Sequence, residues 1–436
     1  MRAGRPSVGG ESERGSQRSE RGSQRSEGGE HRKRLEYQWW YHGLIPRRDI
    51  ETLLKKQGDW LVRLTDRKGV SRVVVSVYWD KDIHHIFLNR VATGWQHQGR
   101  VFRSPYELLK ACKKGKLDIN EHGARLRTPI RKPAWMIPSC DVRRGRKLGS
   151  GAQGDVFDGR YRPDGGRKEL EVALKVCHLA RTTEERETVM EEAKLMMEYH
   201  HPNVCRIYGV TADRPPLTLV MEKCPGGSLE THLRKKAEEG GLSINERLIY
   251  CVEVARGVKY LTGKHCLHRD LASRNCLLGV GGVVKLSDFG LSRQSVQYQV
   301  RNLNVRLPIK WCAPESVLSG VFSPASDIWA TGVLMWEIWT YAQVPWQGKT
   351  AREVVVAVRA GERLSIPEEV PEAVKQVMRE CWELDPGKRI TIKAVKQRLK
   401  REAARRGIVL VPANKQPVPT AATSTIRPSS PRPKPH

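Results

Sequence analysis

Hydrophobic and polar residues alternate in three short runs between residues 60 and 88. These runs span residues 60–64, 72–78 and 83–88. A period of two predicts β-strands, and helical signals flank the runs at residues 47–54, behind Ile45-Pro46, and at 104–112. The pattern therefore predicts a small antiparallel sheet between two helices, within residues 37–131.

A second folded region follows a Pro-containing linker at residues 132–141. Strand patterns dominate from there to about residue 222, and helical patterns dominate from about residue 228 to residue 404. We therefore expect an α+β chain, in which residues 142–404 form a β-rich lobe followed by a larger α-rich lobe.

Both ends of the chain have a low-complexity composition. Residues 1–36 contain an unchanged repeat of Ser-Glu-Arg-Gly-Ser-Gln-Arg, and residues 405–436 are basic and rich in Pro, Ser and Thr. Neither segment has enough aromatic and β-branched residues to offset the entropy lost on ordering. We expect two disordered tails and assign them no site.

The charge is strongly basic and unevenly distributed. The 436 residues carry a net charge of +29, and residues 37–131 alone contain 19 basic and 9 acidic side chains. Phosphorylated ligands, acidic lipid and nucleic acid are the partners that such a charge suggests. The density of basic residues within 37–131 favours a phosphate-binding module. Nucleic acid is not expected, because interleaved surface aromatics and a known reading motif are both missing.

The 10 cysteines stand singly, without a Cys-x-x-Cys pair. This spacing argues against structural zinc and against a disulfide framework. The first residues do not resemble a secretory signal, and no run of about 18 apolar residues occurs. We expect a cytoplasmic protein, and the basic amino-terminal tail leaves peripheral association with the plasma membrane open.

A glycine-rich segment opens the β-rich lobe. It comprises Gly149, Ser150, Gly151, Ala152, Gln153 and Gly154, followed by Asp155 and Val156. Glycines at this spacing let backbone N–H groups approach a polyphosphate closely. A dinucleotide site would require a helix directly after the glycines. The residues that follow read as a strand, so a hairpin over phosphates fits better.

Lys175 ends the apolar run Val172-Ala173-Leu174, 21 residues after Gly154. A buried ammonium is costly without anionic partners, which a triphosphate and a carboxylate would supply. The helical pattern over 183–200 offers Glu191 and Glu192. Only Glu192 falls on the apolar stripe of this helix, so we predict that Glu192 is the carboxylate that pairs with Lys175.

The most specific signal is His268-Arg269-Asp270, with Arg274 and Asn275 behind it, followed by Asp288-Phe289-Gly290. Phosphoryl transfer needs a carboxylate for the attacking hydroxyl, a lysine on the phosphates and an Asp/Asn pair for metal ions. All of these occur in order, with Ala313-Pro314-Glu315 beyond them.

Residues 142–404 thus resemble a protein kinase catalytic domain, and specifically the tyrosine kinase branch. That branch is indicated by Arg274, by Leu307-Pro308-Ile309-Lys310-Trp311, and by Ala272 where a serine/threonine kinase carries Lys. The resemblance implies ATP with Mg²⁺ or Mn²⁺, the metal being held by Asn275 and Asp288. Further implied nucleotide contacts are Leu148, Val156, Ala173, Met221, Glu222, Cys224 and Leu277.

Two further groups of residues have roles implied by this resemblance. Asp327 begins a helix that supports the catalytic loop, and Arg389 pairs with Glu315 in a buried ion pair. Tyr298 lies in the segment that the family orders by phosphorylation, where its phosphate would meet Arg269 or Arg293.

Residues 37–131 resemble an SH2 domain, from Trp40-Tyr41-His42-Gly43 to the strand Trp60-Leu61-Val62-Arg63. One Arg in an apolar strand suits a doubly charged ligand, because its planar fork grips two phosphate oxygens. We assign Arg63 to that role, and the resemblance adds Arg47, His85 and Thr65. Leu64 and Thr65 depart from the usual pattern without removing a required charge.

The order of SH2 and kinase domains is most similar to the Fes/Fer branch of cytoplasmic tyrosine kinases. We therefore expect a non-receptor tyrosine kinase that acts on protein substrates and binds phosphotyrosine-containing proteins. A catalytically dead adaptor is the alternative. The presence of Lys175, Asp270, Asn275 and Asp288 disfavours it.

Overall fold

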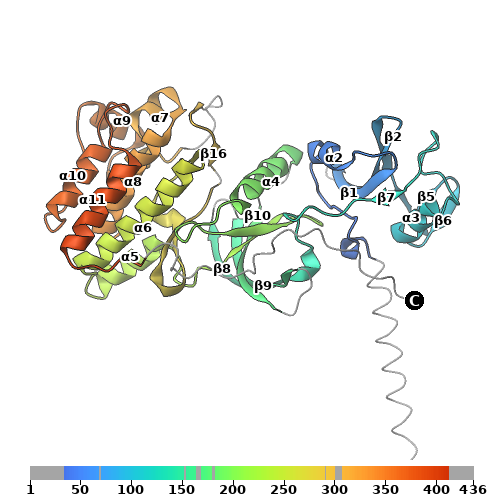
Figure 1. Cartoon of the computed structure of the whole chain (residues 1–436), viewed down its shortest axis with the longest axis horizontal. Helices are drawn as coiled ribbons and strands as arrows, with labels where there is room; N and C mark the ends of the chain where they lie inside the picture. Colours follow the sequence, from blue (N-terminus) through green and yellow to red (C-terminus); the bar gives the residue numbers. More distant parts are fainter. Residues whose placement is uncertain are drawn as a thin grey trace, which may run out of the picture.

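The computed structural model describes residues 34–67, 70–151, 154–163, 168–178, 182–289, 291–299 and 307–411. Figure 1 shows a small amino-terminal module at one end, a β-rich lobe in the middle and a helical lobe at the other end. No helix within the described residues is long and apolar enough to cross a membrane.

The amino-terminal module is a four-stranded sheet, in the order β3-β2-β1-β7, with a helix against each face. Successive strand residues point to opposite faces. Leu61 accordingly packs in one apolar cluster with Ile50 of α2, and Val62 packs in another with Leu108 of α3. The elements are η1 (Leu35–Tyr37), α2 (Arg47–Leu53), β1 (Asp59–Arg67), β2 (Val70–Trp79), β3 (Asp82–Phe87), β4 (Asn89–Val91), β5 (Gly94–His97), β6 (Arg100–Phe102), α3 (Pro105–Lys113) and β7 (Thr128–Pro129).

The middle lobe is a five-stranded sheet in the order β11-β12-β10-β9-β8, with one helix against it. The helix, α4, begins with a capping box in which Thr182 and Glu185 satisfy each other's backbone N–H groups. The elements are η2 (Ser139–Asp141), β8 (Val142–Gly151), β9 (Gly154–Tyr161), β10 (Leu170–Cys177), α4 (Thr183–Met197), β11 (Ile207–Thr211) and β12 (Thr218–Glu222).

The helical lobe is built around α8, whose side chains from Ser326 to Trp339 are all buried. Trp329, Trp336 and Trp382 lie in this core. Its helices are α5 (Leu229–Glu238), α6 (Ile244–Gly263), η4 (Ser273–Asn275), η5 (Val280–Gly282), η6 (Ile309–Trp311), α7 (Pro314–Ser319), α8 (Pro324–Trp339), α9 (Ala351–Arg359), α10 (Glu372–Cys381) and α11 (Ile392–Arg405). Short strands complete it: β13 (Cys266–Leu267), β14 (Cys276–Leu278), β15 (Val284–Leu286), β16 (Arg293–Gln294), β17 (Tyr298–Gln299) and β18 (Val321–Phe322).

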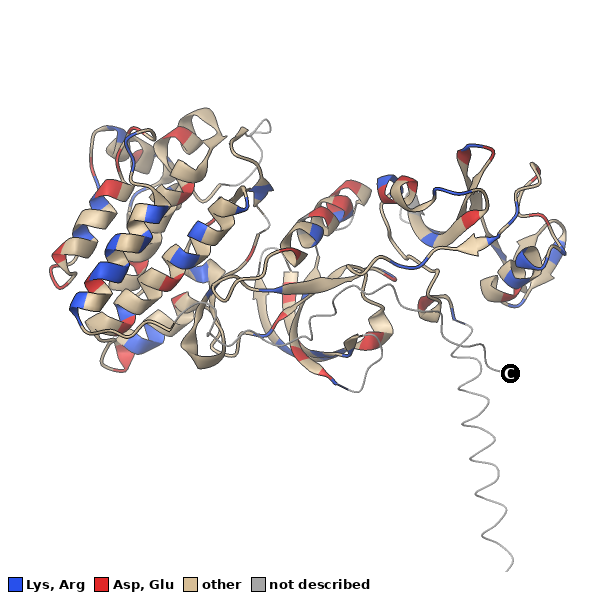
Figure 2. Cartoon of the chain, viewed as in Figure 1, with Lys and Arg blue, Asp and Glu red and all other residues tan. Residues whose placement is uncertain are grey.

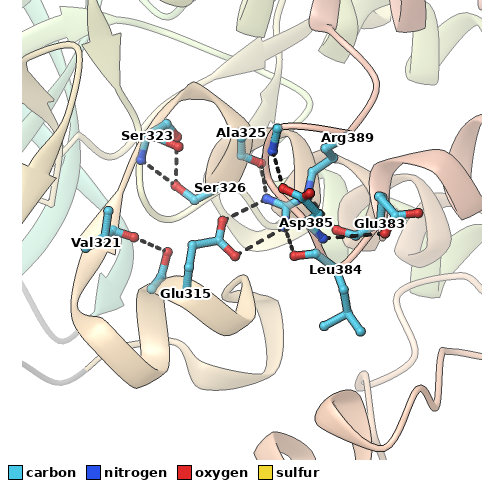
Figure 3. A network of polar contacts seen from close by, with 11 residues as sticks. Glu315, Val321, Ser323, Ala325, Ser326, Glu383, Leu384, Asp385 and Arg389 are labelled. Carbon is cyan, nitrogen blue, oxygen red and sulfur yellow. Dashed lines mark hydrogen bonds and ion pairs between the residues drawn. The ribbon is translucent and has the colours of Figure 1, made fainter.

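An ion pair between Arg389 and Glu315 ties α7 to the segment before α11 (Figure 3). Two guanidinium nitrogens of Arg389 lie 2.8 and 3.2 Å from the two carboxylate oxygens. The same guanidinium donates to the carbonyls of Ala325 and Glu383, and the Arg389 side chain is completely buried. The sequence prediction of this pair agrees with the geometry.

Replacing Arg389 by Met is expected to lower the free energy of unfolding by about 3 kcal/mol or more, because it leaves a partly buried carboxylate unpaired. Chemical denaturation of the whole chain measures this loss. The matched control is Arg379→Met, whose pair with Glu372 is exposed. That change is expected to cost less than about 1 kcal/mol. Equal losses in the two variants would contradict the role given to Arg389.

The amino-terminal module packs closely against the middle lobe at Gly43. Gly43 has φ +52°, and a Cβ atom there would lie 2.0 Å from the carbonyl oxygen of Ala212. The neighbouring Leu44 N–H donates to that same carbonyl, and the Tyr41 hydroxyl donates to the carbonyl of Asp213. Only glycine fits this close approach.

Asp213 fixes the same contact with its side chain. Lys132 Nζ lies 2.6 Å from one carboxylate oxygen, and the backbone N–H of Ser139 donates to the other. The Lys132 and Asp213 side chains are both buried. The linker between the two modules is therefore held to the middle lobe.

Replacing Gly43 by Ala is expected to loosen this contact, because the added Cβ clashes with backbone that cannot move aside. Hydrogen exchange should accelerate at Leu44 and at residues 209–213. The matched control is Gly123→Ala, where φ is +67° but no atom lies within 4 Å of the added Cβ. Unchanged exchange in Gly43→Ala, or equal acceleration in both variants, would contradict the tight contact.

Candidate functional site

A cleft of about 790 Å³ lies between the middle and helical lobes. Twelve of the predicted nucleotide-contacting residues line it: Leu148, Gly149, Ser150, Gly151, Gly154, Val156, Ala173, Lys175, Met221, Glu222, Cys224 and Leu277. Two more, Ala152 and Gln153, lie outside the described residues. The carboxylates of Asp270 and Asp288 face the same cleft, beside Arg274 and Asn275.

The glycine-rich segment forms the end of the hairpin of β8 and β9, with Gly151 paired to Gly154. Gly154 has φ +152°, and a Cβ there would lie 1.9 Å from the carbonyl oxygen of Val176. The side chain of Ser150 donates to Asp155 at 2.6 Å, which ties the two strands together. This hairpin excludes the dinucleotide arrangement, which needs a helix at this point.

Lys175 projects from β10 toward the opposite lobe. Its Nζ lies 3.0 Å from Oδ1 of Asp288, and both side chains are largely buried. Glu192 lies within α4, but its side chain is outside what the structure describes. The alternative, Glu191, is exposed and pairs with Arg48 of the amino-terminal module. Glu191 is thus committed away from the cleft, and the choice of Glu192 stays a prediction.

Asp270 is held by the two residues predicted to accompany it. Arg274 Nη2 lies 2.5 Å from Oδ1 of Asp270, and Asn275 Nδ2 donates to the Asp270 carbonyl at 2.9 Å. The guanidinium of Arg274 stacks 4.3 Å from the ring centre of Trp311. One carboxylate oxygen of Asp270 is therefore fixed by a cation, while Asp270 itself lines the cleft.

Two buried carboxylates of α8 support this loop. Asp327 accepts the backbone N–H groups of His268 and Arg269, at 2.8 and 3.0 Å. Burial raises the pKa of the Asp327 carboxyl, and its hydrogen bonds act in the opposite direction. The prediction that the start of this helix supports the loop matches this geometry.

The second carboxylate, Glu337, was not singled out from the sequence. It accepts from the backbone N–H and hydroxyl of Ser273 and from Nε1 of Trp311. Burial raises the pKa of the Glu337 carboxyl. The available signal was one acidic residue inside the apolar run from Val333 to Trp339, since a buried carboxylate needs partners.

Tyr298 packs against the two predicted arginines. The guanidinium groups of Arg269 and Arg293 lie 4.6 and 5.5 Å from the centre of its ring. Burial lowers the pKa of Arg269, and the charge of Arg293 lowers it further. Two cations therefore stand close together beside one tyrosine, whose own strand β17 pairs with β18.

A second pocket, of about 340 Å³, is lined mainly by the amino-terminal module and partly by the start of α4. Arg47, Arg63, Thr65 and His85, which the sequence predicts to act together, all line it. Arg63 is only 8% exposed, and its Nε donates to the hydroxyl of Ser76 at 3.4 Å. Within the described residues no carboxylate pairs with Arg63, so its buried charge requires an anionic ligand.

The charges of this pocket act on one another. Burial lowers the pKa of Arg63 to about 10, with the charge of Arg47 adding to the effect. Burial also lowers the pKa of His85 to about 4, followed by the charges of Arg63 and Arg47. His85 Nδ1 lies 2.9 Å from the Ser76 hydroxyl, which therefore links the two side chains. Ser76 is fully buried behind the pocket, and the sequence did not reveal its link to Arg63 and His85.

The cleft offers only part of a metal site. Asn275 and Asp288 supply the oxygen ligands that Mg²⁺ and Mn²⁺ prefer. No cluster of three or more His, Cys, Asp or Glu side chains suited to a metal occurs in the described ranges. Two protein oxygens fit a metal that is also bound by substrate phosphates and water, as in kinase sites.

Comparison with known proteins identifies the family of each domain. Residues 142–399 match the family model of protein tyrosine and serine/threonine kinases, and residues 40–111 match the SH2 domain model. The chain is therefore a protein kinase that carries an SH2 domain.

The relatives specify the kind of kinase. The chain is 36% identical over 370 residues to the transforming protein Fps of avian sarcoma virus (strain PRCII), a tyrosine-protein kinase. It is 37% identical over 361 residues to human tyrosine-protein kinase Fer, and 36% identical over 373 residues to Fer-related kinase 1 of Caenorhabditis elegans. The chain belongs to the Fps/Fer family of protein-tyrosine kinases.

These alignments cover 84%, 82% and 83% of the chain. They span 68% of the viral protein, 43% of human Fer and 93% of the nematode protein. The chain therefore corresponds to less than half the length of human Fer. Membership of the family implies ATP and a divalent metal for the kinase domain, and phosphotyrosine for the SH2 domain.

Proposed function

We propose that this chain transfers the γ-phosphate of ATP to tyrosine side chains of proteins, with Asp270 as the residue that orients the attacking hydroxyl. The observation that carries the proposal is the gathering of Lys175, Asp270, Asn275 and Asp288 around one cleft. The tyrosine oxygen attacks the γ-phosphorus, its proton passes to Asp270, and ADP leaves.

The nucleotide is bound mainly by the middle lobe. Backbone N–H groups of the hairpin at Gly149 to Gly154 cover its phosphates, and Lys175 contacts the α- and β-phosphates. The adenine lies against Ala173 and Leu277, beside the backbone of Glu222 to Cys224. Glu192 holds Lys175 from α4 in the active arrangement.

We assign the metal as Mg²⁺, held by Asn275 and Asp288. When bound, it neutralises charge that develops on the phosphates. Asp288 lies 3.0 Å from Lys175, so this carboxylate can contact the lysine and a metal together.

Selectivity for tyrosine follows from the position of Arg274. Its guanidinium lies between Asp270 and the ring of Trp311, and Glu337 holds Trp311 from below. This arrangement makes a flat platform beside the base, on which an aromatic ring can rest with its hydroxyl near Asp270. Tyr298 is the regulatory tyrosine, and its phosphate would pair with Arg269 and Arg293.

The SH2 pocket recruits phosphotyrosine-containing proteins. Arg63 grips two phosphate oxygens, while Arg47, Thr65 and His85 complete the contacts. Burial lowers the pKa of His85 to about 4, so its side chain is neutral near pH 7. The cysteines of the described residues form no disulfide bond, which suits a cytoplasmic location. Peripheral contact with the plasma membrane would use the basic amino-terminal tail.

The test of the proposed activity is transfer from ATP and Mg²⁺ to three peptides that differ only in carrying Tyr, Ser or Thr at the acceptor position. Transfer to the Tyr peptide alone is expected. Equal transfer to the Ser or Thr peptide would contradict the platform at Arg274, and ATP binding without any transfer would favour an adaptor.

A further inference from the structure

The phosphotyrosine pocket has one wall that does not belong to the SH2 domain. Its SH2 side includes Arg47, Arg63 and His85, but the opposite side is formed by Thr183, Arg186 and Glu187. These three residues are in the first turns of α4, a helix of the kinase domain. A ligand in this pocket therefore meets both domains.

Two ion pairs hold α4 at this position. Arg48 of the SH2 domain pairs with Glu191, and Asp49 pairs with Lys194. Both pairs join the short helix α2 to the face of α4 that Figure 2 shows toward the SH2 domain. The wall is thus fixed by contacts outside the pocket, so it is in place before a ligand binds.

The three wall residues differ in what they offer a ligand. Arg186 is buried, and its Nε donates to the carbonyl of Thr182 at 3.0 Å, so it is engaged by its own helix. Thr183 is an exposed hydroxyl. Glu187 is half-buried, and within the described residues its carboxylate has no ion pair or side-chain hydrogen bond. Glu187 is therefore the carboxylate that this wall presents, beside the guanidinium of Arg186.

Resting on the proposed SH2 function, we propose that α4 of the kinase domain selects the phosphotyrosine ligand through Glu187. Arg63 and Arg47 hold the phosphate, so the peptide beside the phosphotyrosine leaves the pocket along its rim. A half-buried carboxylate there favours Lys or Arg and repels Glu or Asp. The preferred ligand carries a basic residue next to the phosphotyrosine, on the flank that crosses α4.

The test measures binding of the full chain to four phosphotyrosine peptides by fluorescence anisotropy. The peptides carry two Lys or two Glu, placed either before or after the phosphotyrosine. On one flank, the wild type should bind the Lys peptide about three- to tenfold more tightly than the Glu peptide. Glu187→Gln should remove this preference, and Glu187→Lys should reverse it.

The matched control is Glu184→Lys, one turn earlier on the same helix. Glu184 is exposed and does not line the pocket. Its replacement should leave the ranking of the four peptides unchanged. Wild-type ranking in both Glu187 variants, or the same altered ranking in Glu184→Lys, would overturn the inference.

Arg63→Ala separates this inference from the function on which it rests. Loss of binding to all four peptides in Arg63→Ala, together with a ranking that depends on Glu187, supports both. If Arg63→Ala abolishes binding but the Glu187 variants rank peptides as the wild type does, only the selection by α4 is overturned. Wild-type binding by Arg63→Ala overturns the pocket itself.

Discussion

Replacing Asp270 by Asn is expected to lower the rate of phosphate transfer to tyrosine about 10²- to 10⁴-fold, the range for loss of a general base. The amide keeps the size of the carboxylate but cannot accept the hydroxyl proton. It also loses the charge that binds Arg274 at 2.5 Å. Steady-state turnover of a tyrosine peptide at saturating ATP measures the effect.

The fold and the nucleotide site should survive this change. Asp270 is not among the residues assigned to adenine or phosphate, so ATP with Mg²⁺ should still raise the melting temperature of the variant. Asp118→Asn, at an exposed position of the SH2 domain, is the control and should keep full turnover. Near-normal turnover in Asp270→Asn would contradict the catalytic assignment.

Replacing Arg63 by Ala is expected to weaken phosphopeptide binding by about 10²-fold or more, as for loss of one partner in a buried charge pair. Arg63 is 8% exposed and stands at the base of the pocket. Lys would be a poor substitute, because it lacks the planar fork that contacts two oxygens. Isothermal titration of the full chain with a phosphotyrosine peptide measures the loss.

The control for Arg63 is Arg90→Ala, which removes an exposed arginine of β4 outside the pocket. The affinity of this variant for the phosphopeptide should stay within about threefold of the wild type, as expected for an exposed charge outside the pocket. Arg63→Ala should also keep most of its turnover on a short tyrosine peptide, since that substrate does not need the SH2 domain. Unchanged phosphopeptide affinity in Arg63→Ala would refute the pocket.

The sequence predicts the fold class of both domains, because period-two and helical patterns follow directly from which side chains are buried. The predicted helix at 47–54 is α2 (Arg47–Leu53), and the predicted helix at 104–112 is α3 (Pro105–Lys113). The glycine hairpin could also be foreseen, since the residues after Gly154 have the character of a strand.

Residues that reach the sites only through tertiary packing could not be found from sequence patterns. Glu337 reaches Ser273 and Trp311 only because α8 passes beneath the catalytic loop. Ser76 joins Arg63 and His85 only through the pairing of β1, β2 and β3. Such contacts depend on tertiary packing, which spacing along one chain does not encode.

Sequence motifs do not indicate the contact between the SH2 domain and the kinase domain. Gly43 of the SH2 domain approaches Ala212 of the middle lobe. Glu191 of α4 pairs with Arg48 of the SH2 domain. Because Glu191 pairs with Arg48, Glu192 is favoured as the partner of Lys175. The apolar spacing of the helix could suggest this choice but could not test it.

The central claim is that this cleft transfers phosphate to tyrosine. The most direct measurement is incubation of the purified full-length protein with ATP and Mg²⁺, followed by mass-spectrometric mapping of phosphate by residue type and position. The account predicts phosphotyrosine at Tyr298 in the wild type and none in Asp270→Asn. Phosphate on Ser or Thr alone, or no incorporation by a folded protein that binds ATP, would contradict it.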